Sequence, residues 1–183
     1  MKNIIYLLII FCALNACGQA EKGETNQPGI SKENLAQEIK TLEDKLLQIQ
    51  DATKDTASAN GLVRKSELYV QHFPADSLSP YLLFRAGDVA RGAGDAEKAV
   101  KLWDSVWRNY ETHRMAPGSL FAQAFTLDAQ LENKKEAERY YLKFLHKYPE
   151  HHLATEVKKL LKMVNKSPDE LVRDFEKNVP KEE

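Results

Sequence analysis

The sequence predicts an all-α domain in which about three helix pairs stack one after another. Apolar residues recur at helical spacing, and no stretch shows the apolar/polar alternation typical of strands. Three aromatic residues that end predicted helices, Phe73, Tyr110 and Tyr148, lie 37 and 38 residues apart. Pro80 and Pro117, close to the starts of the following helices, are also 37 residues apart. A period of this size indicates a repeat built from helix pairs.

Residues 1–16 are predicted to be a signal peptide. Lys2 precedes an apolar run from Ile4 to Leu14, and about ten residues are too few to cross a hydrocarbon core that requires about 20. Leu14 to Cys17 resembles the lipobox of bacterial lipoproteins, in which the cysteine is lipidated and becomes the first mature residue. The resemblance implies a lipid anchor on Cys17. An ordinary secretory signal followed by a chance cysteine is the alternative.

Residues 17–31 are predicted to be a flexible tether, because they are almost devoid of apolar side chains and contain Gly and Pro. Loss of Cys12 with the signal and lipidation of Cys17 would leave no thiol for a disulfide. The 26 basic and 27 acidic residues become 25 and 27 once Lys2 is removed. A charge so balanced gives no electrostatic basis for binding nucleic acid.

The repeat domain is predicted to span residues 32–166, and its first helix is ambiguous. Leucine and isoleucine recur at heptad spacing in residues 32–52, which would suit a coiled coil, but the stripe is short and Leu47 widens it. We favour the first half of a degenerate repeat, and with it a monomer. The stripe is Leu35, Ile39, Leu42, Leu46 and Ile49, and its expected partners are Ala59, Leu62, Val63, Ser66, Tyr69, Val70 and Phe73.

Capping residues predict the boundaries of the later helices. Ser79 reads as an N-cap with Pro80 at the first helical position. Residues 92–95 interrupt the helix, and Asp95 caps the start of the next helix, which ends at Tyr110. Asn133 and Glu136 have the spacing of a capping box, and the helix they begin ends at Tyr148.

Residues 167–183 are predicted to be a terminal capping helix and tail. Ser167 to Glu170 has the pattern of a helix start. Leu171, Val172, Phe175 and Val179 then share one face. End repeats need a cover for their apolar side, so we expect this helix to pack on the preceding one, through Leu153, Val157, Leu160, Leu161 and Val164.

Two segments resemble the tetratricopeptide repeat. Residues 94–99, Gly-Asp-Ala-Glu-Lys-Ala, with Trp103 downstream, fit its pattern, as do residues 135–137, Lys-Glu-Ala, with Tyr141, Phe144 and Pro149. The resemblance implies a right-handed solenoid whose first helices line an inner groove, and a protein-binding scaffold rather than an enzyme. A helix ending in Tyr-Pro looks like that of outer-membrane assembly and Tol-Pal-associated lipoproteins. Since Gly18 is not the Asp of inner-membrane retention, the resemblance implies an outer-membrane anchor with the domain in the periplasm.

The candidate partner-binding residues lie on the predicted first helices. Between Pro80 and Gly92, small and apolar residues gather on one side, and Tyr81, Arg85 and Asp88 gather on the other. In the next repeat the corresponding polar stripe is Gln123, Thr126 and Gln130. Its position depends on the repeat period, because a period of 37 instead of 38 moves the equivalent positions by one residue. One Arg, one Asp and neutral amides suit an extended peptide or a partner helix.

Other side chains show no catalytic or metal-binding pattern. Trp103, Trp107 and Tyr110 share a helix face with Ala99 and Val106, which predicts core rather than a ligand platform. The five histidines include one adjacent pair and no third ligand at metal-like spacing, so we expect no metal, no cofactor and no catalytic residues. The alternative function is a surface lipoprotein that captures a glycan or peptide, for which an exposed aromatic platform would be the sign.

Overall fold

The computed structural model describes residues 30–49, 51–167, 169–170 and 173, and these contain α-helices, one short 3₁₀ helix and no strands. The signal peptide and most of the proposed tether lie outside this range. The helices are α1 (Lys32–Ile49), α2 (Thr56–His72), α3 (Ser79–Gly92), α4 (Ala96–Asn109), α5 (Met115–Ala129), α6 (Lys134–Lys147) and α7 (Ala154–Met163), with the 3₁₀ helix at Ala52–Asp55.

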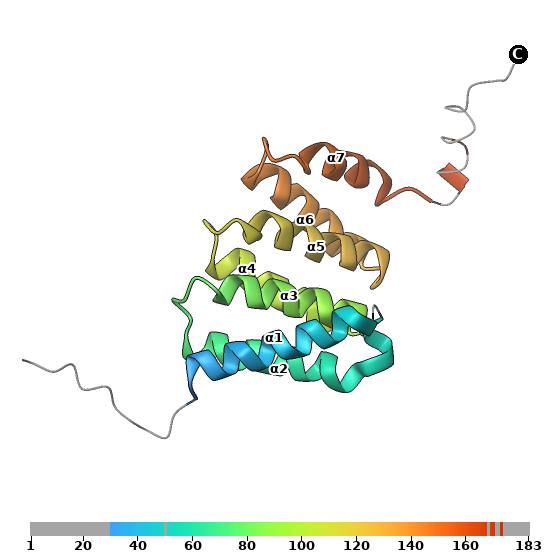
Figure 1. The fold of residues 1–183 in the computed structure, drawn as a ribbon. Helices are drawn as coiled ribbons and strands as arrows, with labels where there is room; N and C mark the ends of the chain where they lie inside the picture. The colour runs from blue at the N-terminus through green and yellow to red at the C-terminus, as the bar shows by residue number, and fades with distance from the viewer. Residues whose placement is uncertain (1–29, 50, 168, 171–172, 174–183) are drawn as a thin grey trace, which may run out of the picture.

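Figure 1 shows the helices stacked in chain order, from α1 and α2 at one end to α7 at the other. Each helix packs on the one that follows it. The arrangement is that of a tetratricopeptide-like array, with the pairs α1/α2, α3/α4 and α5/α6 and with α7 as the last described helix. The predicted all-α fold is confirmed.

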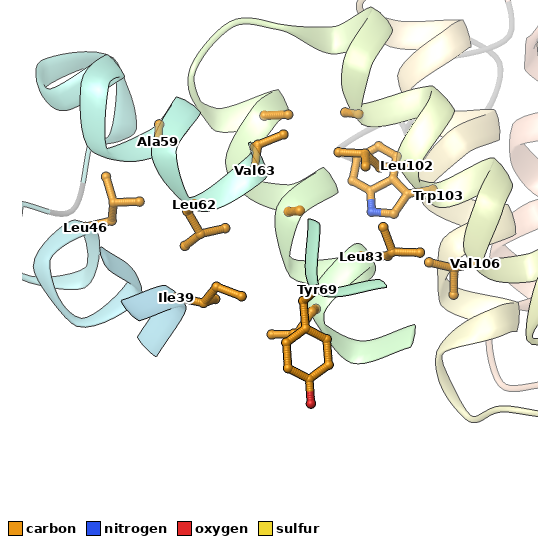
Figure 2. Packing of buried hydrophobic residues seen from close by; sticks show 14 of the residues in the cluster. Ile39, Leu46, Ala59, Leu62, Val63, Tyr69, Leu83, Leu102, Trp103 and Val106 are labelled. Carbon is orange, nitrogen blue, oxygen red and sulfur yellow. The ribbon is translucent and has the colours of Figure 1, made fainter. Parts of the chain in front are cut away.

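The core forms two clusters that meet on α4. Side chains of α1 to α4 fill the first cluster, which Figure 2 shows around Trp103 and Tyr69. The second cluster contains Trp107 of α4 together with residues of α5 to α7. The stripe of α1 faces α2, because Leu35, Ile39 and Leu46 are buried in one cluster with Ala59 and Leu62. Residues 32–49 are therefore half of a helix pair, as we favoured from the sequence.

Three turns of the same construction join the pairs to one another. The backbone N–H groups of Phe73, Tyr110 and Tyr148 each donate to the carbonyl four residues earlier and so end α2, α4 and α6. Three residues further on, Asp76, His113 and His151 occupy one equivalent position. Each accepts a hydrogen bond through its side chain from the backbone N–H two residues ahead, at 2.8 Å for Asp76 and 3.3 Å for both histidines. The sequence period thus reflects a repeated hydrogen-bonding unit.

Two of the predicted helix starts differ in the structure. Leu78, not Ser79, holds the N-cap position of α3, and the Ser79 hydroxyl donates instead to the carbonyl of Phe73 at 2.6 Å. At α6 the Asn133 side chain caps the N–H of Glu136 as expected. The return half of the capping box is missing, because Asn133 N–H donates to the Leu127 carbonyl.

The helix starts at Asp95 and Ser167 agree with the sequence prediction. The Asp95 carboxylate accepts the N–H of Lys98 and begins α4, after a turn in which Gly94 has a φ of 91°. Ser167 and Glu170 form a complete capping box, since each side chain accepts the backbone N–H of the other. Leu171, Val172, Phe175 and Val179 lie outside the described residues, so the packing of the terminal helix stays a prediction.

Candidate partner-binding groove

One side of α3 packs against α4 so closely that it requires small residues. Ala86, Gly87 and Ala90 are buried, as is Leu83. A Cβ atom built on Gly87 would lie 2.4 Å from Nε1 of Trp103, and that nitrogen donates to the carbonyl of Phe84 at 3.2 Å. The predicted close approach of the paired helix is confirmed.

The opposite side of α3 carries Tyr81, Arg85 and Asp88, each half-buried. Nε of Arg85 donates to Oε1 of Glu43 on α1 at 2.7 Å, and Nη1 donates to Oδ2 of Asp88 at 3.1 Å. Burial raises the pKa of the Asp88 carboxyl, against the opposing effect of Arg85. Arg85 therefore ties α3 to α1 and holds two partly desolvated carboxylates.

A groove runs between α1 and α3 on both sides of this ion pair. One hollow of about 410 Å³ is lined by Tyr81, and a second of about 430 Å³ is lined by Arg85 and Asp88; Glu43 lines both. We call the two together the α1–α3 groove. Its other lining residues are Glu33, Ala36, Gln37, Ile39, Lys40, Leu46, Leu47, Asp51, Leu78, Leu82, Val89 and Gly92.

The stripe predicted on α5 is largely wrong in position. Gln123 and Thr126 are only 2% and 1% exposed, and only Gln130 lies at the surface. Oε1 of Gln123 accepts the indole N–H of Trp107 at 2.6 Å, and Nε2 donates to Asp104 at 3.1 Å. In this structure Gln123 links α5 to α4 and cannot reach a partner in the groove.

The stripe on α5 is misplaced because the repeat period changes from 37 to 38 residues within the repeat. The Asp95 N–H donates to Ala90 O, and the Asn133 N–H donates to Leu127 O, both at 2.8 Å. The acceptors are 37 residues apart (127 minus 90), whereas the donors are 38 apart (133 minus 95). The extra residue lies between α5 and α6, so the first helices match with an offset of 37 and the second helices with 38.

With the offset of 37, the equivalents of Tyr81, Arg85 and Asp88 on α5 are Gly118, Ala122 and Phe125. All three are half-buried. The ring of Phe125 lies beside that of Phe121, with centroids 6.1 Å apart. The charged side chains of α3 are thus replaced by apolar or small ones on α5.

The tryptophans belong to the core, as predicted. Trp103 and Trp107 are buried, and Tyr110 is half-buried with its hydroxyl donating to the carbonyl of Pro74. Arg108 and Lys143 lie over the Trp107 ring, 4.4 and 5.1 Å from its centroid. These two indoles do not form the exposed platform that a glycan-binding protein would need.

Two residues that shape the groove escaped the sequence reasoning. The sequence interpretation gives Glu43 no role, and Leu47 enters it only as a residue that widens the heptad stripe. In the structure Leu47 is 60% exposed and lines the groove. The position of Leu47 outside the buried stripe of α1 predicts an exposed leucine, but the adjoining hollow is visible only in the structure.

No helix among residues 30–49 and 51–167 combines the length and the apolar character needed to cross a bilayer. A comparison with protein families matches the tetratricopeptide repeat at residues 81–113 and 119–151, which correspond to α3/α4 and α5/α6 with their following turns. A search of curated proteins finds no match. Tetratricopeptide repeats are generally non-catalytic and typically bind protein partners. Residues 81–113 and 119–151 thus match the tetratricopeptide repeat, and they lie inside a longer helical array with a tetratricopeptide-like arrangement.

Proposed function

We propose that this protein is a membrane-anchored scaffold of the bacterial cell envelope that binds a partner protein or peptide in the groove formed by the first helices of its repeats. The observation that carries the proposal is the α1–α3 groove, which has apolar side chains on its floor and the Arg85–Glu43 ion pair across its middle. Such a surface supplies both apolar contact area and a charged group for orientation.

The binding part of the proposal can be tested by replacing Arg85 and Asp88 together with Ala. The substitution also leaves Glu43, which is only 20% exposed, without its partner, so we expect a loss of stability of about 1–3 kcal/mol and compare both double variants where both are fully folded. Crosslinking in native membranes should then lose a specific partner. The matched control is Glu136→Ala with Arg139→Ala, a pair at the same spacing on α6. An identical set of crosslinked proteins for both double variants would contradict the proposal.

The anchor rests on the resemblance of Leu14–Cys17 to a lipobox, and the absence of Asp after the cysteine supports the outer membrane, with the domain in the periplasm. Cys17→Ser should release the protein from the membrane fraction and abolish metabolic labelling with a fatty acid. Cys12→Ser is the control, since that residue would leave with the signal. A Cys17→Ser protein that stays labelled and membrane-bound would overturn the anchor.

A further inference from the structure

The α1–α3 groove is long enough for a helix. Its α1 side runs from Glu33 to Leu47, which at 1.5 Å per residue is about 21 Å, or about four helical turns. By contrast, Phe84 fills the space between α3 and α5, since a Cβ atom on Gly118 would lie 3.6 Å from its ring. The backbones of α3 and α5 therefore approach each other more closely than those of α1 and α3, which the Arg85–Glu43 ion pair bridges.

Leu47 gives the groove an apolar edge. It is one of the four large apolar side chains that are exposed among the described residues, and it lines one of the two hollows. Leu46 and Val89 continue the apolar surface beneath it. A single exposed leucine is ordinary on a protein surface, but Leu47 together with Leu46 and Val89 gives this end of the groove a contiguous apolar lining.

The charge of the groove is acidic. Its lining contains four carboxylates, Glu33, Glu43, Asp51 and Asp88, and two cations, Lys40 and Arg85. Lys40 pairs with Asp44 outside the groove, Arg85 pairs with both Glu43 and Asp88, and Asp51 pairs with Lys54. The lining itself still carries more carboxylates than cations. Burial raises the pKa of Asp88, which is therefore a carboxylate that an added cation would stabilise.

The chain's own ends do not match this surface. Residues 167–183 contain three basic and six acidic residues, and like charges would oppose docking in an acidic groove. Residues 18–29 contain almost no apolar side chains to cover Leu47. The occupant whose chemistry fits the groove is a segment of another protein.

We propose that the α1–α3 groove binds a basic amphipathic helix of a partner protein. Apolar side chains of that helix lie on Leu46, Leu47 and Val89, and its lysine or arginine residues pair with Glu43, Asp51 and Asp88. This inference rests on the proposed scaffold function and specifies the chemistry of the partner. It also assigns the charged α1–α3 end of the array, rather than the apolar surface of α5, to the contact.

The test is a selection of displayed random peptides of about 16 residues, long enough for about four helical turns, on the purified full chain in detergent. We expect enriched peptides to carry net positive charge and apolar residues at i, i+3, i+4 and i+7, and their binding to weaken as salt rises. Enrichment of acidic or uncharged peptides, or no enrichment, overturns the inference.

Point variants then locate the binding site. Leu47→Ser and Asp88→Asn should each weaken binding of a selected peptide about tenfold. Leu142→Ser and Glu97→Gln are matched controls, because Leu142 is 51% exposed on α6 and Glu97 is an exposed carboxylate on α4 outside the groove lining; both should bind like wild type. Equal binding by Leu47→Ser and Leu142→Ser overturns the inference.

Two further outcomes separate this inference from the scaffold function. Peptides that depend on Phe125 instead of Leu47 would overturn the basic-helix assignment while leaving a groove-binding scaffold intact. If sedimentation shows a dimer that Leu47→Ser converts to a monomer, the occupant is a second copy of this chain and the inference is wrong. Loss of native crosslinks in the Arg85/Asp88 variant is measured independently of either result.

Discussion

Trp107 and Gln123 are joined by a 2.6 Å hydrogen bond between the indole N–H and the side-chain carbonyl, across the contact of α4 with α5. Both residues are buried. The bond therefore satisfies two polar groups that water does not reach, and it holds adjacent repeats in register.

This bond predicts that Gln123 matters for stability rather than for binding. Gln123→Ala leaves the Trp107 N–H without its acceptor and removes buried volume, so we expect about 2 kcal/mol of destabilisation, or a melting temperature lower by about 4–8 °C. Gln130→Ala, at an exposed position on the same helical segment, should change it by less than about 2 °C. Equal melting curves for the two variants would show that the bond adds nothing.

Gly87 should tolerate no side chain. In Gly87→Ala the new methyl group meets the indole of Trp103 at 2.4 Å, and overpacking of this kind costs about 1–3 kcal/mol. Gly61→Ala in α2 is the control, because its methyl group would lie 3.4 Å from Leu42 and the substitution removes backbone entropy from the unfolded chain. Chemical denaturation should show the first variant destabilised and the second unchanged or slightly stabilised.

The turn before α7 should respond to pH. Nδ1 of His151 accepts the Leu153 N–H, which only an unprotonated nitrogen can do. Burial, and then the neighbouring His152, lower the pKa of His151 below its usual 6.5. The unfolded chain therefore binds this proton more readily than the folded chain does. The free energy of unfolding falls as the pH drops below about 6.5, and this loss is complete once the pH is below the folded-state pKa.

His151→Asn tests this, because the amide oxygen can accept the same hydrogen bond and does not titrate. Melting temperatures measured between pH 8 and 5 should fall less steeply in the variant than in wild type. The two proteins should melt alike at pH 8. Parallel curves over the whole range would mean that His151 does not contribute to the pH dependence.

The terminal segment has its own test. Leu160 and Leu161 of α7 are only half-buried, and we expect the apolar residues of 171–179 to cover them. Truncation after Lys166 should lower the melting temperature by several degrees or cause aggregation. Truncation after Pro180, which removes only charged residues, is the control. If the two truncated proteins are equally stable, the segment does not cap the array.

The helices and their packed faces could be predicted because buried stripes and capping residues are local signals. Ala99 to Tyr110 shows the stripe directly, and Asp95 caps its helix as expected. The α5 surface could not be placed, because an error of one residue rotates a helix by 100° and exchanges Gln123 for Ala122. The Glu43–Arg85 pair joins residues 42 positions apart, and no periodicity within a single helix indicates such a partner.

The position of the extra residue between α5 and α6 also determines which length changes an array of this kind can absorb. A residue added in that connection lets each helix keep its own contacts, so the repeat grows without turning any side chain away from its neighbour. The same addition inside α5 would turn every later side chain of that helix through about 100° and bring Thr126 and Gln123 out of the core. Repeats of this protein can therefore differ in length at their connections while each helix keeps its packing.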